Sequence, residues 1–363
     1  MERPQISIIV AGGGTGGHLF PAISVVKEVE KRSDQCRVLF IVGKGGRGAE
    51  IIERHGYQVS TVDVEGMKGR GWKKIVSVLF RLPKSIAQSM GHIRTFDPDV
   101  VLGVGGYSAG PVCIAARIRG IPTAIHEQNT IPGFTNRMLA KIVNKVFVSF
   151  DQTRELLNRP EAIVTGTPIR QELIDSVDAH KTPQSKFTVL VMGGSQGAMA
   201  INKAFADALH LLKSRGKSPA VIHQTGQQDF QRTLEDYKAR GLEGEVIPFI
   251  EDMAEAYSRA HLVICRAGAS TIFELATLRK PAILIPYPFA ANRHQDLNAQ
   301  ALADTGGAVV VFEKDMDGER LASLVERAMD DKEFLLYTEA VEGLARPRAA
   351  ADIADQLMEF AAR

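Results

Sequence analysis

The sequence contains few cysteines and no long apolar run. Its 363 residues include only three cysteines, Cys36, Cys113 and Cys265, which are far apart and lack the spacing of metal ligands. Scattered cysteines in odd number argue against a disulfide framework and favour reduced thiols in a cytosolic protein. No stretch approaches the roughly 18 consecutive apolar residues of a membrane span, and the apolar run before the first glycine turn is too short for a signal peptide. We therefore expect a protein that does not cross a membrane.

Acidic residues are missing from one long stretch of a chain that is otherwise balanced in charge. The 44 basic and 42 acidic residues imply no general attraction to nucleic acid. Between Glu65 and Asp97, however, there is no acidic residue, and apolar residues recur at helical spacing until Pro83 interrupts them. The residues of this predicted membrane-facing helix are Trp72, Lys73, Lys74, Ile75, Leu79 and Arg81. The pattern favours a helix on an anionic membrane surface; the alternative, an apolar stripe packed into its own domain, leaves the missing acids unexplained.

Two common nucleotide motifs are absent or incomplete. No glycine turn is closed by Gly-Lys-Ser/Thr, so a Walker loop is excluded. Gly12, Gly14 and Gly17 do form G-x-G-x-x-G between a strand and a helix, which predicts a phosphate-facing helix N-terminus. The next strand runs into Lys44, where a dinucleotide site usually has an acidic residue for the ribose. Because Lys44 or Arg47 would suit the 2′-phosphate of NADP, an NADP-dependent oxidoreductase stays open as the alternative function.

Short apolar runs alternate with segments of helical period along almost the whole chain. Such alternation is typical of parallel sheets covered by helices on both faces. The first glycine turn has an echo at 187–198, and each turn resembles the start of its own doubly wound domain. A polar stretch with glycine and proline marks a linker near 165–186. We predict an α/β protein with two Rossmann-like domains, 1–167 and 168–345, and a last helix at about 346–363 that is free to pack on the first.

Three further segments carry candidate ligand contacts. The glycine loop at 103–111 also follows a strand and precedes a helix, which indicates more than one phosphate-bearing ligand. Glu274 lies in the first turns of a predicted helix, where a carboxylate can accept hydrogen bonds from both hydroxyls of a ribose; an exposed helix acid is the alternative. The stretch 293–298 supplies amide and basic side chains that suit sugar hydroxyls and a diphosphate.

Taken in order, these motifs resemble those of the MurG family. The resemblance covers essentially the full length and depends on GGGTGGHLFPA, GVGGYSAGP, HEQNTIPGFTNRMLAK, GTPIR, VMGGSQGA, RAGASTIFEL and HQDLNA. Members of this family transfer N-acetylglucosamine from UDP-GlcNAc to undecaprenyl-pyrophosphoryl-MurNAc-pentapeptide (lipid I) and form lipid II. The resemblance implies a GT-B fold, in which two Rossmann-like domains face a cleft, with the acceptor on the first domain and the nucleotide-sugar largely on the second.

The resemblance also implies site residues, partners and location. The expected UDP-GlcNAc contacts are Thr15, Gly16, Gly17, Asn129, Arg170, Ser195, Ile250, Ala269, Ser270, Thr271, Glu274 and Gln295. Acceptor contacts are expected at Gly105, Gly106 and Tyr107. Besides UDP-GlcNAc and lipid I, the implied partners are an anionic membrane surface and proteins of cell-wall synthesis and division. The implied location is cytoplasmic, peripheral on the inner face of the cell membrane.

Transfer from an α-linked nucleotide-sugar to a β-linked product inverts the anomeric carbon, so the enzyme needs one base and a stabilised leaving group. His18 follows the glycine loop at a helix start, where the helix dipole disfavours the protonated imidazole, and it is the first candidate for the base. Glu127, at the end of a predicted strand, is the rival. Arg170 and the backbone around Ser195 would offset the charge on the diphosphate. We expect no cofactor and no essential metal, since no Asp-x-Asp motif stands at a strand end.

Overall fold

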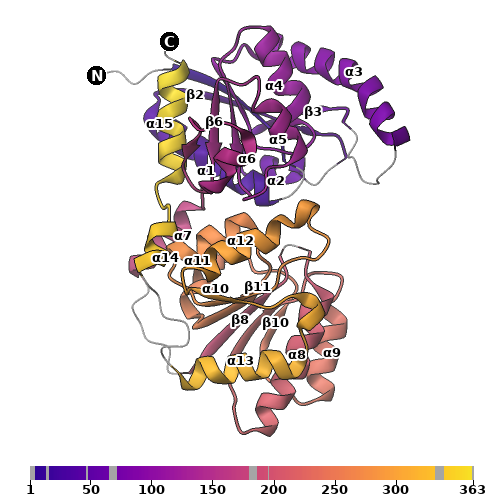
Figure 1. Ribbon diagram of the computed structural model, residues 1–363, viewed down its shortest axis with the longest axis vertical. Helices are drawn as coiled ribbons and strands as arrows, with labels where there is room; N and C mark the ends of the chain where they lie inside the picture. The colour runs from indigo at the N-terminus through magenta and orange to yellow at the C-terminus, as the bar shows by residue number, and fades with distance from the viewer. Residues whose placement is uncertain are drawn as a thin grey trace. The chain divides into compact units, whose positions relative to one another are not determined.

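The computed structural model describes residues 5–13, 16–45, 48–64, 72–179, 186–194, 196–331 and 339–361, with the backbone alone at 72–80, 178–179 and 339–340. The chain divides into two compact units (Figure 1). The first consists of Met1–Arg170 and Arg346–Arg363, and the second of Gln171–Ala345. Each unit is built on its own parallel sheet, which confirms the predicted α/β architecture with two Rossmann-like domains.

In the described residues, the sheet of the first unit has seven parallel strands in the order β3-β2-β1-β4-β5-β6-β7. The strands are β1 (Gln5–Ala11), β2 (Gln35–Gly43), β3 (Gln58–Val62), β4 (Val100–Gly103), β5 (Thr123–Glu127), β6 (Lys145–Val148) and β7 (Ile163–Val164). Strands β2 and β3 extend the sheet to one side of β1, and the later strands extend it to the other side. The β1–β4 junction is therefore the topological switch point, at whose carboxyl end open α/β sheets bind their ligands.

Helices cover both faces of this sheet. They are α1 (Gly16–Arg32), α2 (Gly48–Arg54), α3 (Trp72–Phe96), α4 (Ala109–Ile118), α5 (Phe134–Leu139), α6 (Gln152–Leu157) and α15 (Ala349–Ala361). Successive side chains of β1 point to opposite faces: Ile8 and Val10 pack in a core with α1, and Ile9 and Ala11 pack in a second core with α3 and α4. Burial on both faces explains why β1 is apolar at nearly every position.

Helix α15, at the end of the chain, packs along α1 in the first unit (Figure 1). Its Ile353 and Leu357 are fully buried in the core that α1 shares with the sheet. At its margin, Arg32 Nε lies 2.6 Å from an oxygen of Asp355. The C-terminal residues therefore complete one face of the first sheet, although 175 residues of the second unit separate them from it in sequence.

The prediction that Pro83 interrupts its helix is wrong. Helix α3 continues through Pro83 to Phe96, although proline removes one backbone hydrogen bond and crowds the preceding turn. The turn after Pro83 is held from outside the helix, because the Asp63 carboxylate accepts from Lys84 Nζ at 2.8 Å and from Gln88 Nε2 at 3.2 Å. These hydrogen bonds lower the pKa of Asp63. Among the helices in the described ranges, none is both long and apolar enough to span a membrane.

The second unit repeats the same topology. Over the described residues its parallel sheet has six strands in the order β10-β9-β8-β11-β12-β13. The strands are β8 (Thr188–Met192), β9 (Ala220–Gln224), β10 (Glu245–Ile247), β11 (Leu262–Cys265), β12 (Ala282–Leu284) and β13 (Ala308–Val310). The helices are α7 (Gln171–Ala179), α8 (Met199–Ser214), α9 (Phe230–Ala239), α10 (Met253–Arg259), α11 (Ala269–Thr277), α12 (His294–Ala303), α13 (Gly318–Asp330) and α14 (Glu339–Leu344), with 3₁₀ turns η1 (Ala291–Arg293) and η2 (Glu313–Asp315).

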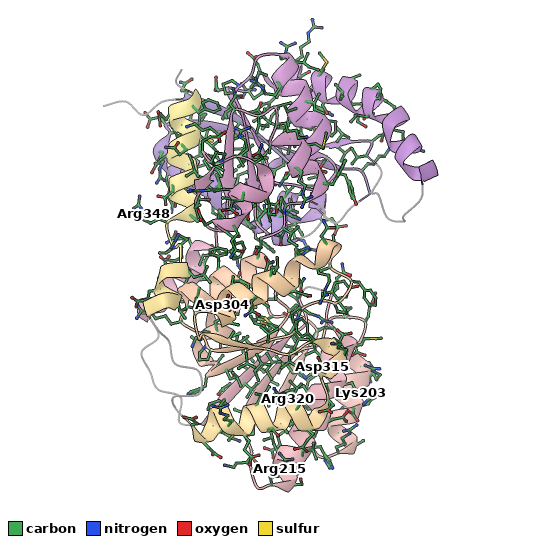
Figure 2. The ribbon with its side chains drawn as sticks, in the orientation of Figure 1. Lys203, Arg215, Asp304, Asp315, Arg320 and Arg348 are labelled. Atoms are coloured by element: carbon green, nitrogen blue, oxygen red, sulfur yellow. The ribbon has the colours of Figure 1, made fainter. Side chains whose placement is uncertain are left out.

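Helices α8 and α13 cover one face of the second sheet. Phe205 of α8 and Leu321 of α13 are fully buried against strand residues that include Val191. Arg215, labelled in Figure 2, follows α8 and lies 2.6 Å from Glu319 and 3.2 Å from Glu326 of α13. Because these ion pairs are partly exposed, each contributes little to stability, and the apolar contacts beneath them hold the two helices together.

One buried histidine in each unit makes stability depend on pH. Desolvation lowers the pKa of His126 to about 4 and that of His223 to about 3. His223 is hydrogen-bonded in its neutral form, at 2.9 Å to Tyr237 Oη and at 3.1 Å to Asn202 Oδ1. Below the unfolded pKa near 6.5, the unfolded chain binds protons that the native chain does not, so stability falls as pH falls towards the folded pKa.

We expect each of the two histidines to remove about 2 kcal/mol from the free energy of unfolding between pH 7 and pH 5. Urea unfolding of the wild type and of His223→Gln at both values measures this. The variant starts from a lower stability, but its loss between pH 7 and pH 5 should be smaller by about 2 kcal/mol. An equal loss in both proteins would contradict the assignment of the effect to His223.

Candidate active site

Two glycine loops meet at the switch point of the first unit. The Gly13 N–H donates to the Gly105 carbonyl at 3.1 Å, and a Cβ atom on Gly12 would clash with that same carbonyl oxygen. Gly106 also lies close to the first loop, since a Cβ there would lie 3.2 Å from the Gly13 nitrogen. Gly12, Gly105 and Gly106 also have positive φ, which residues with a Cβ rarely adopt. Close packing of the loops thus requires several of the glycines in the two motifs.

His18 lies directly beside this junction. It is the third residue of α1, and its Nδ1 lies 3.1 Å from Gln128 Oε1, which follows β5. A Cβ atom on Gly105 would lie 3.5 Å from the imidazole Cε1, so the ring lies over the backbone of the 103–111 loop. His18 is half-buried and lies next to the loop predicted to contact the acceptor.

Glu127 is buried and fully engaged. One carboxylate oxygen accepts from Asn129 N at 3.0 Å and from Asn129 Nδ2 at 3.3 Å. The other accepts from Gly133 N at 3.0 Å and from Asn136 Nδ2 at 2.9 Å. Four donors from the 129–136 segment therefore occupy both oxygens. The arrangement makes Glu127 the anchor of the loop that connects β5 to α5.

Asn136 links several parts of this site, although the sequence analysis gave it no role. Its Nδ2 donates both to Glu127 and, at 3.2 Å, to the carbonyl oxygen of His126. Its Oδ1 is buried, and no donor in the described part of the chain reaches that atom. His126 itself faces away, with Nε2 3.0 Å from the carbonyl oxygen of Gly166. Asn136 lies in the HEQNTIPGFTNRMLAK motif. The motif therefore marks its segment, but nothing in the sequence indicates its hydrogen bonds to Glu127 and His126.

Two other predicted residues lie near the start of α1 or at the edge of the first sheet. The guanidinium of Arg170 lies 5.5 Å from the centre of the Phe20 ring on α1. This places a cation near the turn that holds Gly16 and Gly17, the first residues of α1. Tyr107 follows Gly106 and is exposed. Thr15, by contrast, lies outside the described residues.

The predicted ribose contact in the second unit lies at the second switch point. Helix α11 begins at Ala269 after an extended Gly268 and has no side-chain cap, so the first-turn N–H groups around Ser270 and Thr271 face the end of the sheet. Glu274, one turn later, accepts a hydrogen bond from Tyr257 Oη at 3.0 Å. Tyr257, on α10, is completely buried, so it holds one oxygen of the carboxylate in place. No periodicity in the sequence pairs these two residues.

A buried glutamine connects two more predicted segments of the second unit. Gln224, at the end of β9, donates from Nε2 to the Gly194 carbonyl at 2.9 Å. Its Oε1 accepts from the Ile250 N–H at 3.2 Å. The glycine turn after β8 and the segment after β10 are thereby held together. Ser195, within this turn, lies outside the described residues.

Gln295 lies in the first turn of α12, and its Oε1 accepts from the Tyr287 N–H at 2.9 Å. The preceding turn is strained, because Asn292 and Arg293 have φ values of 53° and 55°. Non-glycine residues in this conformation concentrate at ligand sites. The described residues of the second unit that were predicted to contact UDP-GlcNAc thus follow the carboxyl ends of its strands, where doubly wound sheets bind ligands.

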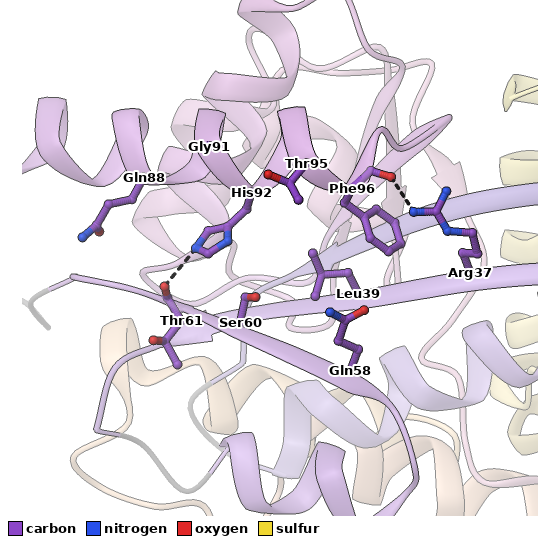
Figure 3. A pocket seen from close by; sticks show the side chains of 10 residues that line it. All are labelled: Arg37, Leu39, Gln58, Ser60, Thr61, Gln88, Gly91, His92, Thr95 and Phe96. Atoms are coloured by element: carbon purple, nitrogen blue, oxygen red, sulfur yellow. Dashed lines mark hydrogen bonds between the residues drawn. The ribbon is translucent and has the colours of Figure 1, made fainter.

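A separate pocket of about 590 Å³ opens in the first unit between the C-terminal half of α3 and the β2–β3 edge (Figure 3). Its lining is mostly polar; His92 Nε2 lies 3.2 Å from the Thr61 carbonyl oxygen, and Arg37 donates to the Phe96 carbonyl oxygen at 2.9 Å. Among the described residues, none of those predicted for the site lines it. Of the predicted membrane-facing residues, the structure describes the side chain of Arg81 alone, which is exposed.

Comparison with known proteins gives a consistent family for both units. The model of the glycosyltransferase family 28 N-terminal domain matches residues 8–148, and that of the family 28 C-terminal domain matches 188–357. The solved structure of Acinetobacter baumannii MurG has a TM-score of 0.79 and 33% identity, and the match covers 98% of this chain and 100% of that one. A UDP-GlcNAc 2-epimerase from Neisseria meningitidis, at 12% identity and a TM-score of 0.65, is similar in fold alone.

Two relatives match over nearly the full length. Each is named UDP-N-acetylglucosamine–N-acetylmuramyl-(pentapeptide) pyrophosphoryl-undecaprenol N-acetylglucosamine transferase. The protein of Syntrophus aciditrophicus (strain SB) is 44% identical, with 97% of this chain and 98% of its own covered; that of Myxococcus xanthus (strain DK1622) is 42% identical, with 98% and 93% covered. These matches give no support to an NADP-dependent oxidoreductase. The chain belongs to the MurG family of N-acetylglucosamine transferases, which have the GT-B fold.

Proposed function

We propose that the two units divide the reaction of the family, with the lipid-linked acceptor on the first unit and UDP-GlcNAc largely on the second. The enzyme transfers N-acetylglucosamine to the MurNAc 4-hydroxyl of lipid I and forms lipid II. The hydroxyl oxygen bonds to the anomeric carbon as the bond to the diphosphate oxygen breaks, UDP departs, and a base takes the hydroxyl proton. The observation that carries the assignment of this base is the contrast between His18 and Glu127.

His18 is the better base of the two. Both oxygens of Glu127 are occupied by four donors, so taking up a proton would cost it at least one of these hydrogen bonds. Within the described ranges His18 has one hydrogen bond, through Nδ1, and it is half-buried beside the loop predicted to contact the acceptor. Glu127 then acts by holding the loop and not by transferring a proton.

Replacing His18 tests this assignment. We expect His18→Ala to lower kcat for transfer by about 10²–10⁴-fold, because a positioned base contributes this much, while UDP-GlcNAc binding is kept. Added imidazole should restore part of the rate. In Glu127→Gln, loss of an acceptor for Gly133 or Asn136 should lower the free energy of unfolding by roughly 1–3 kcal/mol, without rescue by imidazole. A Glu127→Gln enzyme of normal stability and very low kcat, beside an active His18→Ala enzyme, would reverse the assignment.

In the second unit, we assign the nucleotide to the start of α11. The first-turn N–H groups at Ala269, Ser270 and Thr271 suit a diphosphate, because the N-terminus of a helix stabilises negative charge. Glu274 suits the two ribose hydroxyls, and the hydrogen bond from Tyr257 fixes its carboxylate before the ligand arrives. Such fixing lowers the entropic cost of binding.

The Tyr257→Phe variant tests how much the hydrogen bond from Tyr257 to Glu274 contributes to UDP-GlcNAc binding. Loss of one hydrogen bond to a charged group costs about 1.5–3 kcal/mol, so the KM for UDP-GlcNAc should rise by roughly 10- to 150-fold. The KM for the acceptor should not change. Steady-state kinetics with each substrate varied in turn gives both values. An unchanged KM for the donor in Tyr257→Phe, together with a raised one in Glu274→Gln, would show that Glu274 needs no support from Tyr257.

For membrane association, the support lies on α4 and α5. Large apolar side chains are exposed here in a row that starts with Phe134, 64% exposed, and continues one turn later with Met138. The further members of this exposed apolar set are Ile118 and Ile142, with the exposed basic residues Arg119, Arg137 and Lys141 among them. Arg117 Nε donates to the Ile142 carbonyl at 2.8 Å and so joins α4 to the segment that follows α5 at this face. Apolar and basic groups in one patch suit an anionic lipid surface.

Vesicles that contain anionic lipid test this patch. The double variant Phe134→Ser/Met138→Ser should bind them at least about tenfold more weakly than the wild type, since each large apolar side chain contributes roughly 1.5–3 kcal/mol when fully buried. Sedimentation with vesicles at low and high salt measures the affinity and its screening. Phe289→Ser, at an 80% exposed phenylalanine of the second unit, is the matched control and should bind normally. Equal binding by all three proteins would rule out the patch.

A further inference from the structure

We propose that Gln128 is a positioning residue that fixes the tautomer of His18. It holds the imidazole proton on Nδ1, and so leaves the lone pair of Nε2 to accept the proton of the acceptor hydroxyl. This inference deepens the proposed function and rests on the role of His18 as the base. It follows from two hydrogen bonds made by one buried amide.

The first hydrogen bond sets which way the amide points. Gln128 is buried, and its Nε2 lies 3.1 Å from the carbonyl oxygen of Val104. A carbonyl oxygen can only accept, so the NH₂ end of the amide must face Val104. The reverse orientation would bring two oxygens together in a buried site. Val104 is itself fixed, because its N–H donates to the Ala11 carbonyl at 2.8 Å at the end of β1.

The second hydrogen bond transfers this constraint to the histidine. With the NH₂ end directed to Val104, the Oε1 of Gln128 faces His18 Nδ1 at 3.1 Å. This oxygen can only accept, so Nδ1 must carry a proton. A neutral imidazole has one N–H, and Nε2 is therefore the nitrogen with the free lone pair. The other tautomer would put a proton on the nitrogen that has to take one.

The use of an amide has a chemical consequence. In serine hydrolases, a buried carboxylate orients the catalytic histidine and also stabilises its positive charge. A neutral amide gives the orientation and brings no charge to the ring, so Gln128 fixes which nitrogen accepts the proton without adding a carboxylate to the site. The Gly105 backbone lies beside the same ring, since a Cβ at that position would lie 3.5 Å from the imidazole Cε1.

Nitrogen NMR of the full chain with ¹⁵N-labelled histidine tests the tautomer directly. At a pH where His18 is neutral, the wild type should show a protonated Nδ1 and a bare Nε2, with the signals assigned by their loss in His18→Gln. In Gln128→Met, which keeps the size of the side chain but has no oxygen, the signals should move towards the Nε2–H form. A wild type with Nε2–H, or a tautomer unchanged in Gln128→Met, would overturn the proposal.

Kinetics and a matched control separate positioning from a loss of stability. Gln128→Met should lower kcat about 10- to 100-fold and leave the KM for UDP-GlcNAc unchanged. Gln224→Met removes a buried glutamine that also bridges two backbone groups, but in the second unit. It should lower the Tm to a similar extent and leave the His18 signals where they are. Movement of those signals in Gln224→Met as well would assign the effect to general loosening. The spectra test the tautomer and do not depend on turnover. If His18 is not the base, only the His18→Ala kinetics will show it, and the NMR result will still decide whether Gln128 fixes the tautomer.

Discussion

The site in the first unit depends on the close approach of two backbones. The loops after β1 and β4 touch through the Gly13–Gly105 hydrogen bond, with no side chain between them. This contact brings the start of α1, and with it His18, against the 103–111 loop. A side chain on Gly12 would force the loops apart and carry the imidazole away from Gln128. The polar contacts of His18 therefore depend on the close packing of these two backbones.

Around this contact, several buried polar groups each hold a different segment of the site by hydrogen bonds. Glu127 uses both oxygens to hold the 129–136 segment, and Gln128 connects β4 to the histidine. In the second unit, Gln224 holds the glycine turn after β8, and Tyr257 holds the Glu274 carboxylate. Each is a buried group with its hydrogen bonds satisfied, which makes the arrangement rigid and costly to alter. The residues to which we assign ligand contacts are therefore held by buried residues to which we assign none.

The sequence predicts much of this fold because its signals are local. Apolar runs bounded by glycine mark the strands, and the position of His18 directly after the first glycine loop places it at a helix start. Contacts between distant segments leave no such signal. Nothing near Tyr257 in the sequence indicates Glu274 as its partner, and His18 and Gln128 are 110 positions apart.

Local rules also fail where tertiary contacts override them. Proline predicts the end of a helix, yet α3 continues through Pro83 because Asp63 and the apolar core hold the following turns. The exposed apolar face of α5 also could not be predicted from the sequence. Its helix is only six residues long, too short for apolar periodicity to show which side faces the core.

Helix α5 connects the two properties that a lipid-linked substrate requires. Asn136, on its buried side, holds the loop that Glu127 anchors, and Phe134 and Met138 stand on its exposed side. Because these residues share less than two turns of one helix, the exposed apolar face and the 129–136 loop cannot move independently. An acceptor whose lipid stays in the membrane needs its sugar hydroxyl held at a fixed depth from the surface. Under the proposed function, a single short helix with the 129–136 loop on one side and lipid on the other would fix that depth by its own rigidity.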